Sequence, residues 1–378
     1  MQHFRLFEFW RLSAAMLVVI YHFLWHAPPE DFIWATRLYR LLPLLDMFFM
    51  ISGFLIMLRY ADKLLTPAAY GRFLLRRIAR LYPLYLVTLV FFVVVGVAVS
   101  LGIVSTGSPE RFDFSVLLHN ILLIQAWGTT DALTFNYVAW SLSAEWFCYL
   151  LLPLLAIVLR RYGPKGLILL AVACMLALEA AAAADLVPFE TWLDTNTWGA
   201  YRAFIDFAVG GAVAIIVRDS ALTWRSHGPA WAVFGLAITA MLTIWSGYAV
   251  FVLLAISLFL AGLAERNNPD GSRFLSPLHP VAKASFSIYL IHPVVELLLF
   301  SGLWRLLVEP MGAINFYAFW LLPLFLTIAL AVMSDRYFEA PVNRWLVDRW
   351  DRRDRAAAQR LKGQSAANFT PTSTPPMA

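Results

Sequence analysis

The amino-acid sequence predicts an all-α polytopic membrane protein whose chain crosses the bilayer about ten times. Its 378 residues are 61% hydrophobic and only 14% charged, and the mean hydropathy is +0.70. Soluble domains carry about 25% charged residues, so a water-soluble fold could not bury this much apolar surface. The 15 tryptophans and 14 tyrosines fit the aromatic belts that form at the two membrane interfaces.

Ten apolar segments are candidates for spanning helices, and several lie near the lower limit of about 17 residues. They cover residues 9–26, 41–60, 81–103, 139–160, 166–184, 199–218, 229–247, 248–264, 280–304 and 317–338. We expect residues 1–345 to form one transmembrane domain. Residues 346–378 are charged and then rich in Ser, Thr and Pro, a composition that predicts a disordered cytoplasmic tail.

The charges of the loops predict the orientation of the chain, because cytoplasmic loops are enriched in lysine and arginine. The second connection is strongly basic, the fourth, sixth and eighth are also basic, and the third and fifth are acidic. This alternation places both termini in the cytoplasm and the protein in the cytoplasmic (inner) membrane. The net charge of +5 then belongs to cytoplasmic loops and does not indicate a nucleic-acid partner.

The two cysteines, Cys148 and Cys174, lie inside apolar segments. Neither has the spacing of a metal site or of a redox pair, so we expect packing roles for both. The sequence predicts no bound metal and no bound cofactor.

The first apolar segment holds an arginine at its start and a histidine deep inside it. Arg11 and His22 are eleven residues apart, so in a helix they lie within about 20° of one face and about 16 Å apart along the axis. His22 would then lie near the middle of the bilayer, where an ionisable side chain marks a functional site by default. A histidine that only hydrogen-bonds a neighbouring helix fits the same spacing equally well.

The second apolar segment carries Asp46 and, near its middle, Ser52 and Gly53. Gly53 allows a second backbone or a ligand to come close, and Ser52 can donate a hydrogen bond. Ordinary small-residue helix packing explains both residues equally well. Asp46 is harder to explain in this way, because a carboxylate near the outer interface costs energy unless it is paired.

Four arginines precede the third segment, in the stretch RFLLRRIAR, and the last three of them are candidates for ligand binding. Arg77 and Arg80 are three residues apart and share a helix face, and Arg76 is beside them. Guanidinium groups bind phosphates through paired hydrogen bonds. Basic residues at a cytoplasmic helix end also hold a span in register and contact lipid headgroups, and the pattern alone favours this second explanation.

Four further polar residues lie in or beside later segments. Glu145 lies five or six residues into the fourth segment, where a carboxyl group must pair with a cation or be protonated. His292 lies in the ninth segment, where packing and function are equally good explanations. Arg336 and Glu339 lie near the cytoplasmic end of the tenth, where Glu339 would suit a helix-end ion pair. An interior of histidine and carboxylates above a basic mouth suits acid–base chemistry on an anionic ligand that enters from the cytoplasm.

Six sequence elements, in this order, resemble the acyltransferase-3 family over residues 5 to 345. They are Arg11 with ten residues to His22, DMFFMISGF at 46–54, RIAR at 77–80, WSLSAEWFCYL at 140–150, SIYLIHP at 287–293 and YFEAP at 337–341. Members of that family are membrane enzymes that transfer acyl groups, usually acetyl from acetyl-CoA, to hydroxyls of glycans and other molecules.

The resemblance implies roles for individual residues. His22 matches the catalytic histidine of the family, and Arg11 matches its partner on the same helix. Arg77 and Arg80 match a motif associated with acyl-CoA binding. The remaining matches are Ser52 and Gly53 in the SGF motif, and Glu145, His292 and Glu339 at recurrent polar positions without a settled role.

These matches give a mechanistic hypothesis. His22 is the general base, because a neutral imidazole suits proton transfer near pH 7. Asp46 or Glu145 orients its ring, and Ser52 or an arginine stabilises the oxyanion. Arginines at the cytoplasmic mouth hold the CoA phosphates. Direct attack by the acceptor and a route through an acyl-histidine intermediate both stay open.

The expected partners are acyl-CoA, membrane lipids and a glycan or glycolipid acceptor. Exopolysaccharide, lipopolysaccharide, a glycolipid and a small metabolite all stay open as acceptors, as do a homo-oligomer and partner proteins of glycan synthesis. The main alternative is a proton-coupled transporter or flippase of an anionic metabolite or lipid-linked glycan. A non-catalytic membrane scaffold is the third hypothesis.

Overall fold

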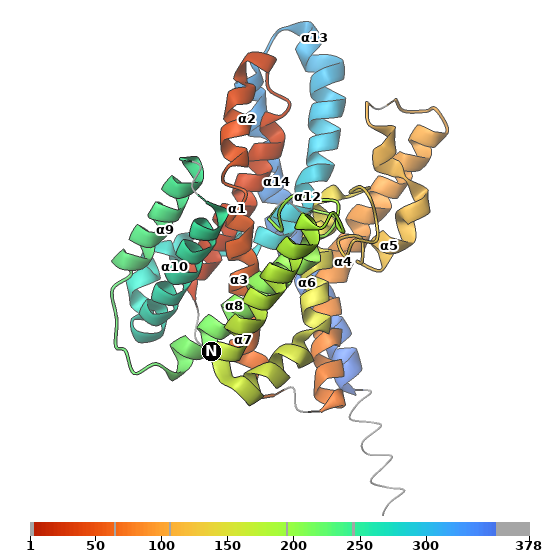
Figure 1. The fold of residues 1–378 in the computed structure, drawn as a ribbon. Coiled ribbons are helices and arrows are strands. Elements are labelled where there is room, and N and C mark those ends of the chain that lie inside the picture. Colours follow the sequence, from red (N-terminus) through yellow and green to blue (C-terminus); the bar gives the residue numbers. More distant parts are fainter. Residues whose placement is uncertain (1–3, 64–65, 106, 194–195, 244–245, 353–378) are drawn as a thin grey trace, which may run out of the picture.

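The computed structural model describes residues 4–63, 66–105, 107–193, 196–243 and 246–352, and these form helices and turns without any strand. The longer helices are α1 (Arg5–Leu24), α3 (Leu44–Tyr60), α4 (Pro67–Ser100), α6 (Trp140–Leu150), α7 (Leu152–Ala183), α8 (Gly199–Asp219), α9 (Gly228–Leu242), α10 (Gly247–Asn267), α12 (Ser285–Glu296) and α14 (Phe316–Ser334) (Figure 1). The shorter ones are α2 (Phe32–Tyr39), α5 (Leu117–Ile121), α11 (His279–Lys283) and α13 (Glu309–Met311). The predicted all-α membrane fold is confirmed.

Eight helices in the described ranges are long and apolar enough to cross a membrane. They are Arg5–Leu24, Pro29–Tyr60, Pro67–Ser100, Leu152–Ala183, Gly199–Asp219, Gly247–Asn267, Ser285–Met311 and Phe316–Arg352. The two remaining predicted segments are also helical. The 229–247 segment forms α9, which is only 15 residues long, and the 139–160 segment is divided between α6 and the start of α7.

A sharp kink inside α7 explains why two predicted segments belong to one long helix. Gly163 has φ 67° and ψ −167° there, a conformation that glycine reaches at little cost because it has no Cβ. Pro164 follows directly, and its fixed φ suits the first turn of a new helical arm. The kink therefore lies between the predicted segments 139–160 and 166–184.

The predicted arginine stretch lies inside α4 because this helix begins at Pro67, well before the apolar run. The Thr66 side chain accepts a hydrogen bond from the backbone N–H of Ala69, at 3.2 Å, and Pro67 occupies the first helical position. Both are typical helix-start signals. Arg77 and Arg80 therefore extend from a continuous helix and not from a loop.

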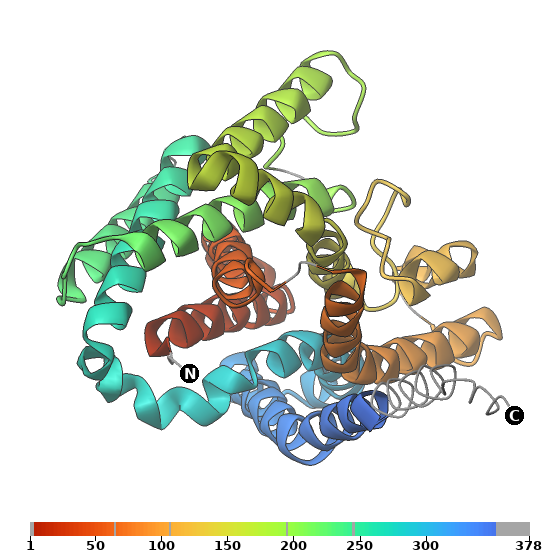
Figure 2. The same ribbon diagram turned by 90° about the horizontal axis from the view of Figure 1, so that it is seen from below.

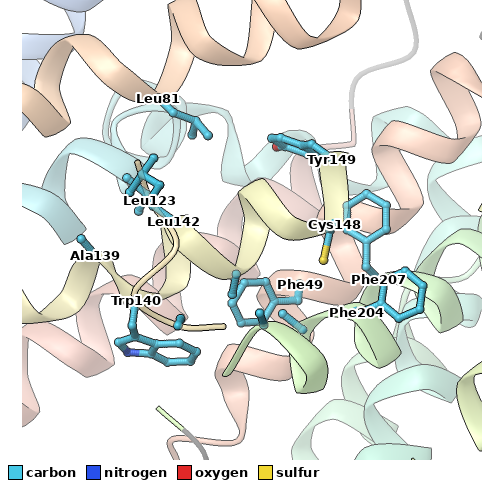
Figure 3. Close-up of a cluster of buried hydrophobic side chains, with 14 of the residues drawn as sticks. Phe49, Leu81, Leu123, Ala139, Trp140, Leu142, Cys148, Tyr149, Phe204 and Phe207 are labelled. Carbon is cyan, nitrogen blue, oxygen red and sulfur yellow. The ribbon is translucent and has the colours of Figure 1, made fainter. Parts of the chain in front are cut away.

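The inner part of the bundle contains α1 and α3, with the other long helices around them (Figure 2). A buried aromatic cluster joins α3, α6 and α8, with Phe49, Trp140 and Phe207 among its members (Figure 3). Cys148 is buried in the same cluster, in agreement with a packing role. Cys174 is partly buried and packs against this cluster.

Both described ends of the chain lie at the same end of the bundle, the lower end in Figure 1. The last helix continues to Arg352, so the first seven residues of the predicted tail, 346–352, are helical. The remainder of that tail, 353–378, lies outside the described residues. A shared end agrees with the prediction that both termini face one side of the membrane, and the side itself stays a prediction.

Helices α3 and α8 approach each other closely through glycines. A Cβ added at Gly53 would lie 2.2 Å from the carbonyl oxygen of Phe207, and one at Gly210 would lie 1.9 Å from that of Met50. Both obstacles are backbone atoms, which cannot rotate away. The close approach predicted at Gly53 is therefore helix packing, the simpler of the two explanations.

Replacing Gly53 with alanine is expected to lower the melting temperature of the detergent-solubilised protein. Overpacking of this kind costs about 1–3 kcal/mol, and more where backbone must shift. A fluorescence thermal-shift assay measures the change. The matched control is Gly235→Ala on α9, where an added Cβ has no atom within 4 Å. Equal melting temperatures for the two variants would contradict the α3–α8 contact.

Candidate active site

Two predicted histidines meet in the structure, although 270 residues separate them in the sequence. Nδ1 of His22 on α1 lies 2.9 Å from Nε2 of His292 on α12. The rings stack with their centroids 5.1 Å apart and their planes at 12°. His292 is fully buried and His22 partly so. One nitrogen must donate and the other accept, so each ring sets the tautomer of its partner.

A carboxylate network lies against this histidine pair. The Tyr137 hydroxyl donates a hydrogen bond of 2.6 Å to Oε2 of Glu296, and Nε2 of His26 lies 3.0 Å from Oε1. The Tyr137 ring meets the His22 ring at right angles, with centroids 5.0 Å apart. Burial and the neighbouring Glu296 raise the pKa of Tyr137 well above its usual range, so its phenol stays protonated and acts as a donor.

The sequence analysis did not single out Tyr137, Glu296 or His26. A signal for two of them was present, because His22 and His26 are four residues apart, as are His292 and Glu296. Residues at that spacing share a helix face, and each pair lies in an otherwise apolar stretch. Tyr137 follows no helical pattern, since it opens the short turn Tyr137–Ala139 before α6.

Arg111, from the Pro109–Phe112 turn, lies over the Tyr137 ring. Its Cζ is 4.7 Å from the centre of the Tyr137 ring and 4.6 Å from that of Phe92. Its Nε donates to the Phe135 carbonyl at 3.0 Å, and its own carbonyl accepts from the Phe135 N–H at 2.7 Å. Its Nη2 is buried and has no hydrogen-bond partner among the residues that the structure describes.

The predicted CoA-binding arginines gather around one cavity of about 190 Å³, here called the arginine cavity. Its lining residues come from α1, α3, α4, α6 and α12: Arg11, Ser52, Leu55, Ile56, Arg59, Arg77, Arg80, Leu81, Glu145, Tyr149 and Phe286. Arg59 was not predicted for this role. Arg76 is exposed on α4 and is not a lining residue.

Aromatic rings and one carboxylate hold these arginines in place. The Arg77 guanidinium lies 5.3 Å from the Phe73 ring centre and 5.7 Å from those of Tyr60 and Tyr149. Arg80 lies 3.7 Å from the Asp335 carboxylate. Cationic groups held in this way on fixed rings form a preformed site for an anionic ligand.

The two carboxylates expected to orient His22 have other partners. Asp46 forms a two-pronged ion pair with Arg202 on α8, with distances of 2.7 and 2.8 Å. Glu145 accepts a 2.5 Å hydrogen bond from Tyr149 and lines the arginine cavity. Asp46 therefore does not orient His22, because it faces α8, and Glu296 occupies the position beside the histidines.

The last two predicted residues lie away from both histidines and arginines. Glu339 accepts hydrogen bonds from Ser287 on α12 and from Ser334 at the end of α14, the latter at 2.9 Å. It joins two helices through hydroxyl groups, so the expected helix-end ion pair is replaced by serine partners. Arg336 is exposed and lies 5.3 Å from the Tyr337 ring centre.

A narrow space, here called the passage, adjoins the arginine cavity on the side of helix α12. Its volume is about 10 Å³, and its lining residues are Ala15, Leu45, Phe48, Ser141, Leu142, Glu145, Phe286 and Tyr289. It shares Glu145 and Phe286 with the arginine cavity. The Tyr289 ring in turn lies 5.8 Å from that of His292.

Helix α1 follows the same route. Ala15 is four residues after Arg11 and seven before His22, so all three side chains share one face of the helix. Arg11 lines the arginine cavity, Ala15 lines the passage, and His22 contacts His292. The predicted common face of Arg11 and His22 therefore borders the arginine cavity, the passage and the His292 ring in turn.

A second cavity, here called the aspartate cavity, lies beside the passage and has a volume of about 360 Å³. It shares Leu45 with the passage. Its lining is aromatic and polar as well as apolar: Tyr39, Arg40, Leu42, Pro43, Leu45, Asp46, Trp140, Leu193, Asn196, Arg202, Met241, Gly247 and Val250. Asp46 lies in the first turn of α3 and Arg59 in the last, so the two cavities flank opposite ends of that helix.

Comparisons with known proteins identify the family of the chain. A family profile described as an acyltransferase domain, acyltransferase-3, matches residues 6–335. The protein named acyltransferase MdmB, from Streptomyces mycarofaciens, is 27% identical over 278 residues, which cover 66% of this chain and 67% of that protein. No solved structure matches. Since the profile covers nearly the whole helical bundle and both histidines, this chain belongs to the acyltransferase-3 family of membrane acyltransferases.

Proposed function

We propose that this acyltransferase is a cytoplasmic-membrane enzyme that moves an acyl group, acetyl from acetyl-CoA, onto a hydroxyl of a cell-envelope or exported glycan. The observation that carries the proposal is the route along α1. Four arginines, Arg11, Arg59, Arg77 and Arg80, line one end of the route, and the histidine pair lies at its inner end. A ligand that fits this route has a polyanionic head and a long, thin reactive arm, as an acyl-CoA does.

The arginine cavity is the donor site in this proposal. Guanidinium groups suit phosphates because their N–H groups donate two parallel hydrogen bonds. With the phosphates at the cytoplasmic end, the pantetheine arm follows α1 past Ala15 and Glu145. Arg11 and His22 are about 16 Å apart along the helix axis, so the arm carries the thioester to the histidines while the nucleotide stays at the mouth.

His22 is the base in this proposal, and His292 fixes its tautomer. When Nε2 of His292 accepts a hydrogen bond from Nδ1–H of His22, the lone pair on Nε2 of His22 is free to take a proton. The acceptor oxygen attacks the thioester carbonyl carbon as its proton passes to that nitrogen. The tetrahedral intermediate then collapses, the C–S bond breaks, and the imidazolium returns the proton to the CoA sulfur. The products are the ester and free CoA.

The acceptor reaches the histidines from the aspartate cavity. A volume of about 360 Å³ is within the range of small-molecule sites, which is roughly 300–1,000 Å³. Trp140 and Tyr39 offer aromatic surfaces, and Asn196 offers an amide, which together suit a sugar ring with its hydroxyls. With the basic loops in the cytoplasm, this cavity faces the opposite side, so donor and acceptor arrive from different sides of the membrane.

Proteoliposomes with acetyl-CoA labelled in the acetyl group test the proposal. We expect the label to appear as a base-labile ester on envelope glycan supplied at the face opposite the CoA. Sealed vesicles that move an anionic metabolite or lipid-linked glycan without consuming acetyl-CoA would instead identify a transporter. Comparison of envelope glycans from cells with and without this chain would then show which ester is lost.

A further inference from the structure

A carboxylate, Glu296, and a cation, Arg111, lie near the histidine pair. Their signs are opposite to the charges that develop in acyl transfer, where the base becomes positive and the carbonyl oxygen negative. Tyr137 contacts His22 through its ring, and its hydroxyl donates to Glu296. Arg111 lies over the same ring at 4.7 Å. The proposed base His22, the Glu296 carboxylate and the Arg111 cation therefore all contact the Tyr137 side chain.

We propose that Arg111 stabilises the oxyanion of the tetrahedral intermediate, and that Glu296 stabilises the imidazolium form of His22. The inference rests on the proposed acyl transfer and assigns two residues that lie outside the sequence motifs of the bundle. Arg111 would touch the reacting oxygen through its Nη2–H groups. Glu296 acts through Tyr137 and His26 and is a positioning residue.

The hydrogen bonds of Arg111 show which of its atoms hold the loop and which atom is available to a ligand. Its backbone and its Nε are used by Phe135, which explains how the loop is held. Nη2 has no such use, although it is buried. A buried donor without a partner costs about 1–3 kcal/mol, so a site that retains one gains from an acceptor that arrives with the substrate.

The charge balance of the reaction supports the same assignment. When the acceptor oxygen attacks, the carbonyl oxygen becomes negative and His22 becomes positive. Fixed charges directed at these positions lower the barrier most where water is excluded. Arg111 supplies the positive charge and Glu296 the negative one, and both contact Tyr137 before the substrate binds.

The other predicted oxyanion stabiliser lies elsewhere. Ser52 lines the arginine cavity with Arg59, Arg77 and Arg80, whereas the histidine pair lies beyond the passage. Among the residues that the structure describes around Tyr137, Arg111 is the cation that contacts its ring.

The test measures acetyl transfer by Arg111→Gln protein in proteoliposomes with labelled acetyl-CoA. Removal of one oxyanion donor typically lowers kcat by about 10²–10³-fold, and we expect that loss with the KM for acetyl-CoA unchanged. Arg305→Gln is the matched control, since Arg305 is exposed on the helical stretch after Glu296. Glu296→Gln is expected to lower kcat and to shift the pH–rate profile, because the charge that stabilises imidazolium is lost.

If the Arg111→Gln variant fails to fold, Arg111→Ala protein assayed with added methylguanidine provides a second test. Partial recovery of kcat, at an unchanged melting temperature, is expected from a catalytic guanidinium, and a purely structural arginine would not give it. Wild-type kcat in a folded Arg111→Gln protein, or no recovery with methylguanidine, would overturn the inference. If wild-type protein itself transferred no acetyl group from acetyl-CoA, the proposed function would fail instead.

Discussion

His22→Ala protein will fold and insert into membranes but will transfer acyl groups about 10²–10⁴-fold more slowly than wild type, the usual contribution of a general base. The fold should survive because His22 is partly exposed and the substitution removes one side-chain hydrogen bond, to His292. The measurement is the initial rate of label transfer from acetyl-CoA, together with the melting temperature of each variant.

A second histidine variant gives the matched control. His279 pairs with Glu8 at 2.8 Å, and its side chain is 43% exposed, so His279→Gln should leave the transfer rate unchanged. His292→Gln should have an intermediate effect, because the amide can still bond to His22 but cannot fix its tautomer in the same way. A folded His22→Ala protein with the wild-type rate would remove His22 from the chemistry.

The Arg77→Gln/Arg80→Gln double variant will raise the KM for acetyl-CoA by about 10²-fold or more. A hydrogen bond to a charged group contributes about 1.5–3 kcal/mol, and every 1.4 kcal/mol is about a factor of ten in affinity. Since the arginines act on the nucleotide and not on the thioester, kcat should change little. Steady-state kinetics over a range of acetyl-CoA concentrations separates the two parameters.

Acetylpantetheine provides a sharper form of this test, because it carries the same thioester without the nucleotide phosphates. Its turnover should be equally slow in wild type and in the double variant. Arg76→Gln, on the exposed face of the same helix, should behave as wild type with both donors. An equal loss with both donors would mean that the arginines support the fold and do not bind phosphate.

Much of the fold is predictable because membrane helices follow from apolar length and loop charge. The long apolar segments, the arginine face of α4 and the common face of Arg11 and His22 all depend on spacing within one helix. That parts of the fourth and fifth segments continue as one kinked helix did not follow, since it depends on the backbone conformation of Gly163. A glycine–proline pair indicates a break, but not whether two arms continue as one kinked helix.

The candidate site was predictable only in part, for a related reason. Spacing places a side chain on a face, but it does not identify the neighbouring helix. Asp46 was correctly expected to need a cation, and its partner, Arg202, lies 156 residues away. Glu296, Tyr137 and Arg111 come from three separate parts of the chain, and only the contacts of Tyr137 with His22, Glu296 and Arg111 show that they lie together.

The small size of the passage has a consequence for the cell. A space of about 10 Å³ holds barely one water molecule, since roughly 10–15 Å³ is the minimum for one. No continuous file of water therefore fits in it, and the side chains that line it must move apart for the pantetheine arm of the proposed donor to pass. If acyl transfer follows the proposed route, the passage would open only around the donor and would stay closed to water and ions between turnovers.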